Sequence, residues 1–467
     1  MTTSETTTSG ARAVSLDGRR FQFEGPLEPG FEPGGFVTLS TPTGSICLGQ
    51  VEEVSFSLGG GLHGSGRILG MIPDEGGVLD SRTPTPFSAA DVRVADAPTI
   101  ESLYDGAATS LVIGSHLGSD SVPARLLPRR LNRHTFWCGQ SGSGKTYALG
   151  VVLEQILLHT ALPMVIFDPN ADFVKMHEAA TTGADSPASR VLAERDIRIL
   201  RPDSDSLRVR FLDLAIQSKA AVLRLSPLDD RAEYNELLRL EETVGTLDAH
   251  AVVPRLLERG SPAAQDLAAR AENLNLIEWS VWAGTSEAVT DVLDRRPDAT
   301  VLDLGGFAFP DESLVVAMAV LDDLWAKREQ RRPILIVIDE AHNLCSPDQN
   351  SPLHVAVRER IIQIAAEGRK FGLWLLLSTQ RPSRIHPSIL SQCDNLALMK
   401  MTSQVDLEEL ATIFGFVPPD MLARASRFAQ GEALFAGSFS PAPSMVKLGQ
   451  RLTREGGADV GVPIRGV

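Results

Sequence analysis

Cysteine is scarce in this chain. Its 467 residues include only Cys47, Cys138, Cys345 and Cys393, which are far apart and form no C-x-x-C pair. That spacing supports neither a disulfide framework nor a zinc site. We therefore expect the cysteines to be small, buried hydrophobic residues.

Long apolar runs are also missing. No stretch approaches the roughly 20 apolar residues of a transmembrane helix. Residues 1–10, MTTSETTTSG, have neither the basic nor the hydrophobic segment of a secretory signal. The sequence predicts a cytoplasmic protein without membrane association, long enough for more than one domain.

Basic residues are fewer than acidic ones. Lys and Arg number 44 against 59 Asp and Glu, which gives a formal net charge of −15. This excludes a surface coated for non-specific binding of nucleic acid, because such binding relies on Lys and Arg that neutralise phosphates. It does not exclude DNA, since a ring-shaped protein can line a narrow pore with a few basic residues and keep an acidic exterior.

The most informative segment that is present fits the phosphate-loop pattern G-x-x-x-x-G-K-[ST]. The apolar strand candidate His134–Cys138 precedes it, and residues 147–158 follow with apolar side chains at helical spacing. In such a loop the backbone N–H groups surround the phosphates, the Lys reaches the terminal phosphates, and the hydroxyl after it ligates Mg²⁺. The residues predicted to bind ATP here are Gly139, Gln140, Ser141, Gly142, Ser143, Gly144, Lys145 and Thr146, with Thr146 also a magnesium ligand.

A second motif supplies carboxylates. The continuous β-branched and apolar run Ile334–Ile338 is typical of a central strand in a parallel sheet, and Asp339 and Glu340 follow at its carboxyl end. We expect Asp339 to hold the magnesium shell and Glu340 to act as the general base that polarises the attacking water. The alternative for Glu340 is a carboxylate at the N-terminus of the next helix.

Composition shifts divide the chain into predicted domains. Residues 1–13 are predicted to be a disordered tail, 14–95 a small β-barrel, 96–132 a connector, 133–450 an α/β ATPase domain and 451–467 a C-terminal tail. Leu- and Ala-rich sequence at about 226–297 predicts a helical insertion. The strand candidates are 21–23, 36–39, 46–51, 54–57 and 67–70 in the barrel, and 163–167, 197–200, 221–225, 300–304, 334–338 and 373–378 in the ATPase domain.

Further motifs follow the strand candidates in a fixed order. They are DPNADF at 168–173, EGRKFG at 367–372, STQRPS at 378–383 and LSQCD at 390–394. Together with the phosphate loop and the acidic pair, they resemble the HerA branch of the HerA/FtsK ATPases, which are hexameric DNA translocases. The resemblance covers roughly residues 15–55 and 120–445. It implies an α/β, RecA-like P-loop ATPase core with inter-subunit ATP sites, and a small N-terminal HAS-barrel.

The resemblance also implies roles for single residues. The phosphate-loop and Walker-B residues match those of the family, Gln380 matches its polar sensor, and Asp168 matches the acidic residue of a D-P-x-x-[DE]-[FY] element near the nucleotide. Gln at the end of a strand beside the phosphate loop suits hydrogen bonding to the γ-phosphate or the attacking water. For both Gln380 and Asp168 the alternative is a side chain that only caps the end of its strand.

A hexamer of this kind needs a cation from the neighbouring subunit to stabilise the transition state of phosphoryl transfer. Among Arg358, Arg360 and Arg369, we favour Arg360 and Arg369 as arginine-finger candidates, and the alternative for each is a solvated side chain on a helix. Arg381 and Arg384 are candidates for contact with DNA or with another subunit.

The sequence therefore predicts an ATP-hydrolysing enzyme, active as a homo-oligomeric ring, that translocates along or unwinds double-stranded DNA. It contains no nuclease motif, so a separate nuclease or effector would act with it, in DNA repair or phage defence. Two alternatives stay open: a ring ATPase that transports or remodels protein, and a scaffold that ATP assembles and that activates a nuclease.

Residues 339–342 also spell the DEAH box of monomeric superfamily 2 helicases. We regard that match as coincidence, because the other motifs of those helicases do not follow.

Overall fold

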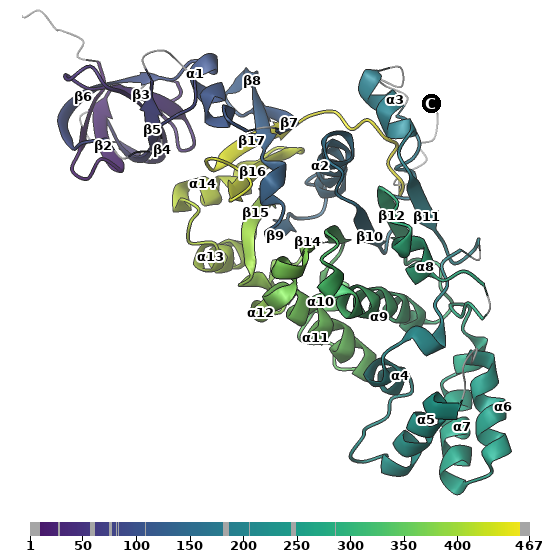
Figure 1. Cartoon of the computed structure of the whole chain (residues 1–467). Coiled ribbons are helices and arrows are strands. Elements are labelled where there is room, and N and C mark those ends of the chain that lie inside the picture. The colour runs from purple at the N-terminus through teal and green to yellow at the C-terminus, as the bar shows by residue number, and fades with distance from the viewer. Residues whose placement is uncertain are drawn as a thin grey trace, which may run out of the picture. The chain divides into compact units, whose positions relative to one another are not determined.

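The computed structural model describes residues 10–457 except 27–28, 57–60, 74–76, 81, 83, 108, 181–185, 205, 244–248 and 285. The chain forms two compact units. Unit 1 comprises residues 1–131, 138–155 and 394–450, and unit 2 comprises residues 132–137, 156–393 and 451–467. Figure 1 shows their helices and strands.

Unit 1 begins with a closed antiparallel barrel, as predicted. In β2 and β3 large apolar side chains such as Phe21, Phe23 and Leu39 point into the barrel and are buried. The predicted strands 46–51 and 54–57 are one long strand. Of the predicted tail 1–13, residues 1–9 lie outside the described residues. Strand β1 begins at Arg12, so the end of the predicted tail belongs to the barrel. The barrel order is β1-β2-β5-β4-β3-β6, formed by β1 Arg12–Ser15, β2 Arg20–Gly25, β3 Phe36–Ser40, β4 Ile46–Phe56, β5 Leu62–Ile72 and β6 Phe87–Val94.

The rest of unit 1 is an antiparallel sheet with short helices. The predicted connector 96–132 contains α1 Ala97–Glu101 and a hairpin of β7 Leu111–His116 and β8 Ser119–Leu126. β7 pairs with the C-terminal strand β17, so strands far apart in the sequence meet. The barrel is bonded to this region, because Gln50 Nε2 donates to the Pro443 carbonyl at 2.7 Å and Arg424 pairs with Glu32 at 2.8 Å. The remaining elements are β15 Cys393–Met399, α13 Gln404–Ile413, α14 Pro419–Ala423, β16 Glu432–Gly437 and β17 Ser444–Leu448.

Unit 2 contains a parallel sheet whose strands are buried apolar runs. Val165 of β10 lies opposite Thr300 of β12 and Ile336 of β13, and Ile338 of β13 lies opposite Leu377 of β14. The helices α9 Pro310–Ala326 and α11 Pro352–Glu367 run side by side (Figure 1) and pack on each other. The strand order is β11-β12-β10-β13-β14-β9, formed by β9 His134–Cys138, β10 Met164–Asp168, β11 Ile197–Leu200, β12 Ala299–Asp303, β13 Ile334–Ile338 and β14 Leu373–Thr379.

Most strands predicted for the ATPase domain are confirmed, but the one at 221–225 is wrong. Ala221 and Val222 end α4 Ile216–Val222, and Arg224 then turns the chain with a φ of 53°. A buried apolar run this short has no period that separates strand from helix. Of the tail predicted at 451–467, residues 458–467 lie outside the described residues; within 451–457, Thr453 pairs with Ala179 and Arg451 is buried.

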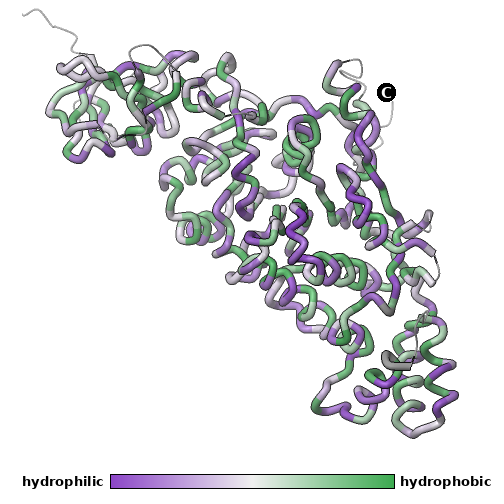
Figure 2. Tube along the Cα trace, viewed as in Figure 1, coloured by the Kyte–Doolittle hydropathy of each residue, from purple (hydrophilic) through white to green (hydrophobic). Residues whose placement is uncertain are grey.

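The predicted insertion is helical. It contains α5 Arg231–Thr243, α6 Ala249–Arg259, α7 Pro262–Asn273 and α8 Val289–Asp294, and Figure 2 shows hydrophobic and hydrophilic residues mixed along these helices, as amphipathic packing requires. The remaining helices are α2 Lys145–His159, α3 Pro187–Ala193, α10 His342–Cys345 and α12 Pro387–Leu390. Within the described part of the chain, no helix is both long enough and apolar enough to span a bilayer. All four cysteines are buried, as predicted.

Candidate functional site

The phosphate loop belongs to unit 1 and joins the end of β9 to the start of α2. Gly142 and Gly144 have φ values of 76° and 85°, which L side chains rarely adopt. A Cβ on Gly139 would lie 2.7 Å from Met399 Cβ, so β15 leaves no room for a side chain there. The glycines of the motif are thus required by the backbone conformation and by close packing.

Hydrogen bonds hold the loop in place within unit 1. Gln140 N donates to the Lys400 carbonyl at 2.9 Å, and Gly431 N donates to the Ser143 carbonyl at 3.0 Å. The Gln140 side chain accepts from the backbone N–H and the hydroxyl of Thr402 at 3.1 and 2.8 Å, so it braces the loop. Lys145 is buried at the first position of α2.

The predicted acidic pair belongs to unit 2, at the carboxyl ends of the neighbouring strands β13 and β14. Asp339 and Glu340 are 2% and 6% exposed. Ser378 Oγ donates to Asp339 Oδ1 at 2.6 Å, and Gln380 Nε2 donates to Glu340 Oε1 at 2.7 Å. Two adjacent parallel strands thus bring the predicted metal ligand, general base and sensor together.

One neighbour of this group was not predicted. His342 begins α10, and its Nδ1 lies 3.3 Å from Glu340 Oε2 and 3.1 Å from Thr379 Oγ1. The Glu340 carboxylate is therefore in contact with Gln380 on one side and His342 on the other. The feature of the sequence that includes His342 is the DEAH match at 339–342.

Glu340 also has an unusual backbone. Its φ of 43° is in the left-handed region, which a residue with a long side chain enters at a cost of about 1–3 kcal/mol. Strain of this kind persists where surrounding contacts fix it, and here Gln380 and His342 hold the side chain. The conformation directs the two successive carboxylates, Asp339 and Glu340, to different partners.

Asp168 closes the turn that follows β10. It is fully buried, and its two carboxylate oxygens accept the N–H groups of Asp172 at 2.9 Å and Phe173 at 2.8 Å. Burial raises the pKa of Asp168 to about 7, and the negative charges of Asp172 and Asp339 add to this. These contacts are those of a strand-end cap; contact with a nucleotide stays a prediction.

The arginine-finger candidates differ in their surroundings. Arg360 on α11 donates through Nε and Nη2 to Asp322 Oδ1 at 2.9 and 2.8 Å, and its guanidinium lies 5.8 Å from the Trp325 ring centroid. Arg369 Nη2 donates to the neutral Gln392 side chain at 3.5 Å. A finger role for either residue stays a prediction.

The other arginines of this region are also placed. Arg358 is buried and donates to the carbonyls of residues 346 and 349 at 2.9 Å, so it holds the loop after α10. Arg384 pairs with Asp348, and Arg381 is exposed. Within the described residues, no group of three or more His, Cys, Asp or Glu side chains is arranged to hold a metal ion.

Comparisons with known proteins show similarity to a family model and to several helicases. Residues 111–320 match the family model described as the central domain of helicase HerA. The chain is 24% identical over 401 residues to a DNA double-strand break repair helicase HerA of Sulfurisphaera tokodaii, covering 82% of this chain and 77% of that protein. It is 24% identical over 417 residues to a probable helicase of Methanocaldococcus jannaschii, covering 84% and 77%. Among solved structures, it resembles the bacterial conjugative coupling protein TrwBΔN70, with a TM-score of 0.49 and 15% identity over 76% of this chain and 92% of that one.

Proposed function

We propose that this chain is a HerA-like P-loop ATPase that forms a ring and couples ATP hydrolysis to movement along, or unwinding of, duplex DNA. The observation that carries the proposal is the group at the ends of β13 and β14, where Ser378 and Gln380 hold the buried Asp339 and Glu340. Buried carboxylates at the carboxyl end of a parallel strand, in a chain that also has a phosphate-loop motif, are suited to phosphoryl transfer, not to a purely structural role.

In the proposed mechanism, the backbone N–H groups of the phosphate loop and Lys145 bind the phosphates of ATP. Thr146 and Asp339 would hold Mg²⁺, which neutralises charge on the β- and γ-phosphates when bound. The residues fit this ion, because Mg²⁺ prefers one or two carboxylates together with substrate phosphates and water.

Glu340 accepts the proton of the attacking water. Gln380 and His342 contact its two oxygens, so they fix the direction in which the carboxylate points before the water is in place. We propose that His342 acts as a positioning residue and makes no direct contact with the nucleotide.

The arginine finger would come from the neighbouring subunit of the ring. The ion pair with Asp322 and the contact with Trp325 already engage Arg360 within its own chain, and an arginine that must reach another subunit would have to leave both. Arg369 contacts a neutral amide at the distance of a weak hydrogen bond. Arg360 and Arg369 both stay candidates for the finger.

The barrel is the proposed dock for a separate nuclease or effector. Leu16 and Phe56 are 91% and 67% exposed on the barrel and would be available for such a contact. The relatives named as double-strand break repair helicases support a role in DNA repair.

The test is the ATPase rate with and without linear duplex DNA, measured on a sample whose oligomeric mass is determined. We expect a ring whose turnover rises when DNA is added and whose DNA affinity falls as salt rises. If an intact ring neither binds duplex DNA at low salt nor hydrolyses ATP faster with it, the DNA-motor proposal is wrong and transport or remodelling of protein takes its place. If ATP is bound without steady turnover, the assembled-scaffold alternative is favoured.

A further inference from the structure

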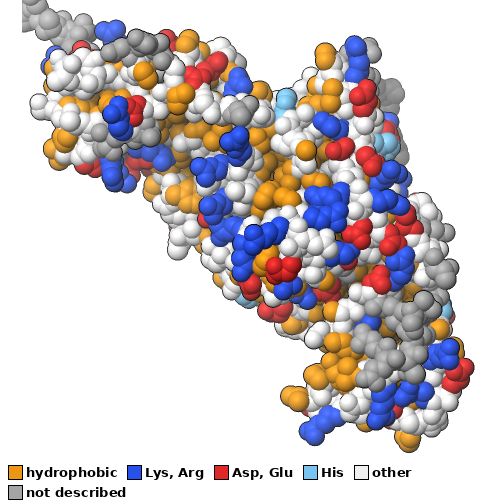
Figure 3. All heavy atoms as spheres, viewed as in Figure 1, with side chains coloured by type: hydrophobic (Ala, Val, Ile, Leu, Met, Phe, Trp, Pro, Cys, Tyr) orange, Lys and Arg blue, Asp and Glu red, His pale blue; other side chains and the backbone are white. Residues whose placement is uncertain are grey.

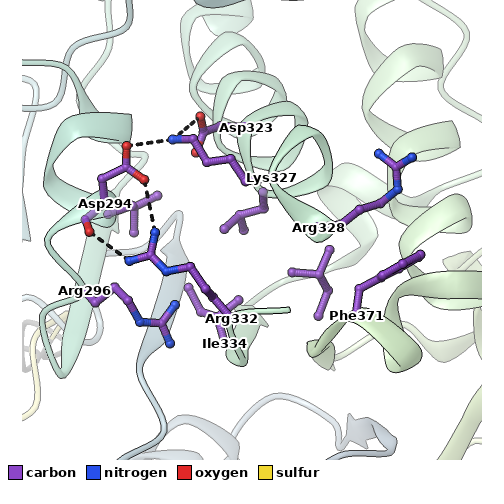
Figure 4. Close-up of a pocket in the computed structure, with 11 residues that line it drawn as sticks. Asp294, Arg296, Asp323, Lys327, Arg328, Arg332, Ile334 and Phe371 are labelled. Atoms are coloured by element: carbon purple, nitrogen blue, oxygen red, sulfur yellow. Dashed lines mark hydrogen bonds and ion pairs between the residues drawn. The ribbon is translucent and has the colours of Figure 1, made fainter. Parts of the chain in front are cut away.

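A cavity of about 30 Å³ lies in unit 2 at the amino ends of β13 and β14, the edge opposite the predicted catalytic carboxylates. Its wall is apolar at Leu293, Ile334 and Phe371. Its charged lining consists of Arg296, Lys327, Arg328, Arg332, Asp294 and Asp323 (Figure 4). We call it the arginine pocket.

Two arginines brace the turns on either side of the arginine pocket. Arg296 Nη2 donates to the Pro333 carbonyl at 2.5 Å, and Arg332 Nη2 donates to the Asp294 carbonyl at 3.1 Å. Arg296 is in the left-handed region, with a φ of 55°. The two guanidinium groups therefore lie close together, as Figure 4 shows, although their charges repel.

The acidic residues of the pocket do not balance these charges. Asp294 and Asp323 both accept from Lys327 Nζ at 2.7 Å, and Arg332 comes within 3.8 Å of Asp294. The pKa of Arg296 is lowered from its usual value, first by burial and then by the charge of Arg332. Four cations and two carboxylates line the pocket. Arg328 also pairs with Glu329 at 3.9 Å and lies over the Trp325 and Phe371 rings, so an excess of one positive charge is left near Arg296 and Arg332.

This excess is notable in a chain whose formal net charge is −15. On the face drawn in Figure 3, Lys and Arg side chains gather in groups among acidic and apolar ones. Half-buried cations that repel each other raise the energy of the empty pocket, and an anion between them would remove that cost.

We propose that the arginine pocket binds a phosphate group. Guanidinium groups donate paired N–H bonds that match two phosphate oxygens, and the apolar wall strengthens such charge-assisted bonds by keeping water away. Two sources fit: a phosphodiester of duplex DNA, which rests on the proposed function, and free inorganic phosphate.

The test compares Arg296→Gln with the matched control Arg295→Gln. Arg295 is the preceding residue, and its side chain is 58% exposed, pairs with Glu287 at 2.6 Å and does not line the pocket. Binding of inorganic phosphate is measured by calorimetry with the phosphate loop saturated by ADP. Wild type and Arg295→Gln should bind, and Arg296→Gln should bind about tenfold more weakly or worse, as expected for the loss of a charge-assisted hydrogen bond.

The DNA arm measures the affinity for a short duplex at several salt concentrations. Loss of one phosphate contact should reduce the slope of log affinity against log salt by about one in Arg296→Gln and leave it unchanged in Arg295→Gln. If phosphate binding and the slope both change, DNA is the source; if only phosphate binding changes, the source is free phosphate.

The proposal is overturned if Arg296→Gln and Arg295→Gln behave alike in both arms. If wild type does not bind duplex DNA at all, the proposed function fails, while the phosphate arm still decides the pocket. Thermal unfolding of each variant shows that it is folded. Should Arg296→Gln not fold, Arg332→Gln removes the second guanidinium at a position that lies outside the left-handed region.

Discussion

We predict that the buried His134 makes the folded protein less stable in acid. It begins β9, the strand that leads into the phosphate loop, and its side chain is fully buried. Its Nδ1 accepts the Leu375 N–H at 2.9 Å and its Nε2 lies 3.0 Å from the Ala365 carbonyl, so the ring is neutral with its proton on Nε2. Burial lowers the pKa of His134 to about 4, and the positive charge of Arg369 adds to this effect.

The direction in which the free energy of unfolding changes with pH follows from proton binding by the folded and unfolded chains. In the unfolded chain His134 takes up a proton as the pH falls below about 6.5, while the folded chain resists protonation down to about pH 4. The contribution to stability is therefore fully present above pH 6.5 and is lost as the pH falls toward 4. Between pH 7.5 and pH 5 the free energy of unfolding should drop by about 2 kcal/mol through this residue alone.

The assay is urea unfolding of His134→Gln and of the control His159→Gln, with hydrogen exchange in β13 and β14 as the local readout for unit 2. His159 is exposed at the end of α2, so its replacement should leave the pH dependence as in wild type. His134→Gln should be less stable at pH 7.5 but should lose about 2 kcal/mol less on going to pH 5. Equal losses in the two variants would refute the reasoning.

Three further predictions concern catalysis. Lys145→Ala should lose ATP binding or turnover, whereas Glu340→Gln should keep ATP bound and hydrolyse it at least about 10²-fold more slowly; a rate within about threefold of wild type would show that Glu340 is not the base. His342→Ala should lower kcat about tenfold with KM for ATP within about twofold, and His342→Asn should recover part of it; a matching rise in KM would contradict a positioning role. An Arg369→Ala chain and a Lys145→Ala chain, each inactive alone, should regain ATPase activity in mixed rings, and proven mixed rings without activity would remove Arg369 from the finger role.

The fold could be predicted where local pattern and burial agree. β13 is a continuous apolar run, β9 and β10 are mostly apolar, all three end at a motif, and each is a strand. The hairpin β7–β8 and the strands β15, β16 and β17 were not predicted, because they have polar or small residues among the apolar ones and depend on partners distant in the sequence. Ala221 and Val222 of the run at 221–225 belong to α4, which packs on α11, and their own sequence does not reveal this packing.

In the candidate site, too, some residues could be assigned from the sequence and others could not. The motif residues Asp339 and Glu340 could be assigned from sequence because a parallel sheet presents strand ends at one edge. The contact of His342 with Thr379 depends on how α10 leaves β13, and the ion pair that engages Arg360 depends on the packing of α9 against α11. No spacing in the sequence encodes these side-chain directions.

The interleaving of the two units has a consequence for synthesis. Most of unit 2 is one continuous stretch, 156–393, whereas unit 1 is assembled from three stretches. Roughly 330 residues separate β7 from its partner β17, so at about 5–20 residues per second the β7 edge waits roughly 15–65 s on the ribosome. Throughout that interval its unpaired backbone is open to other strands. A nascent chain that has completed the stretch 156–393 of unit 2 thus still lacks the strand that pairs with β7 near its beginning.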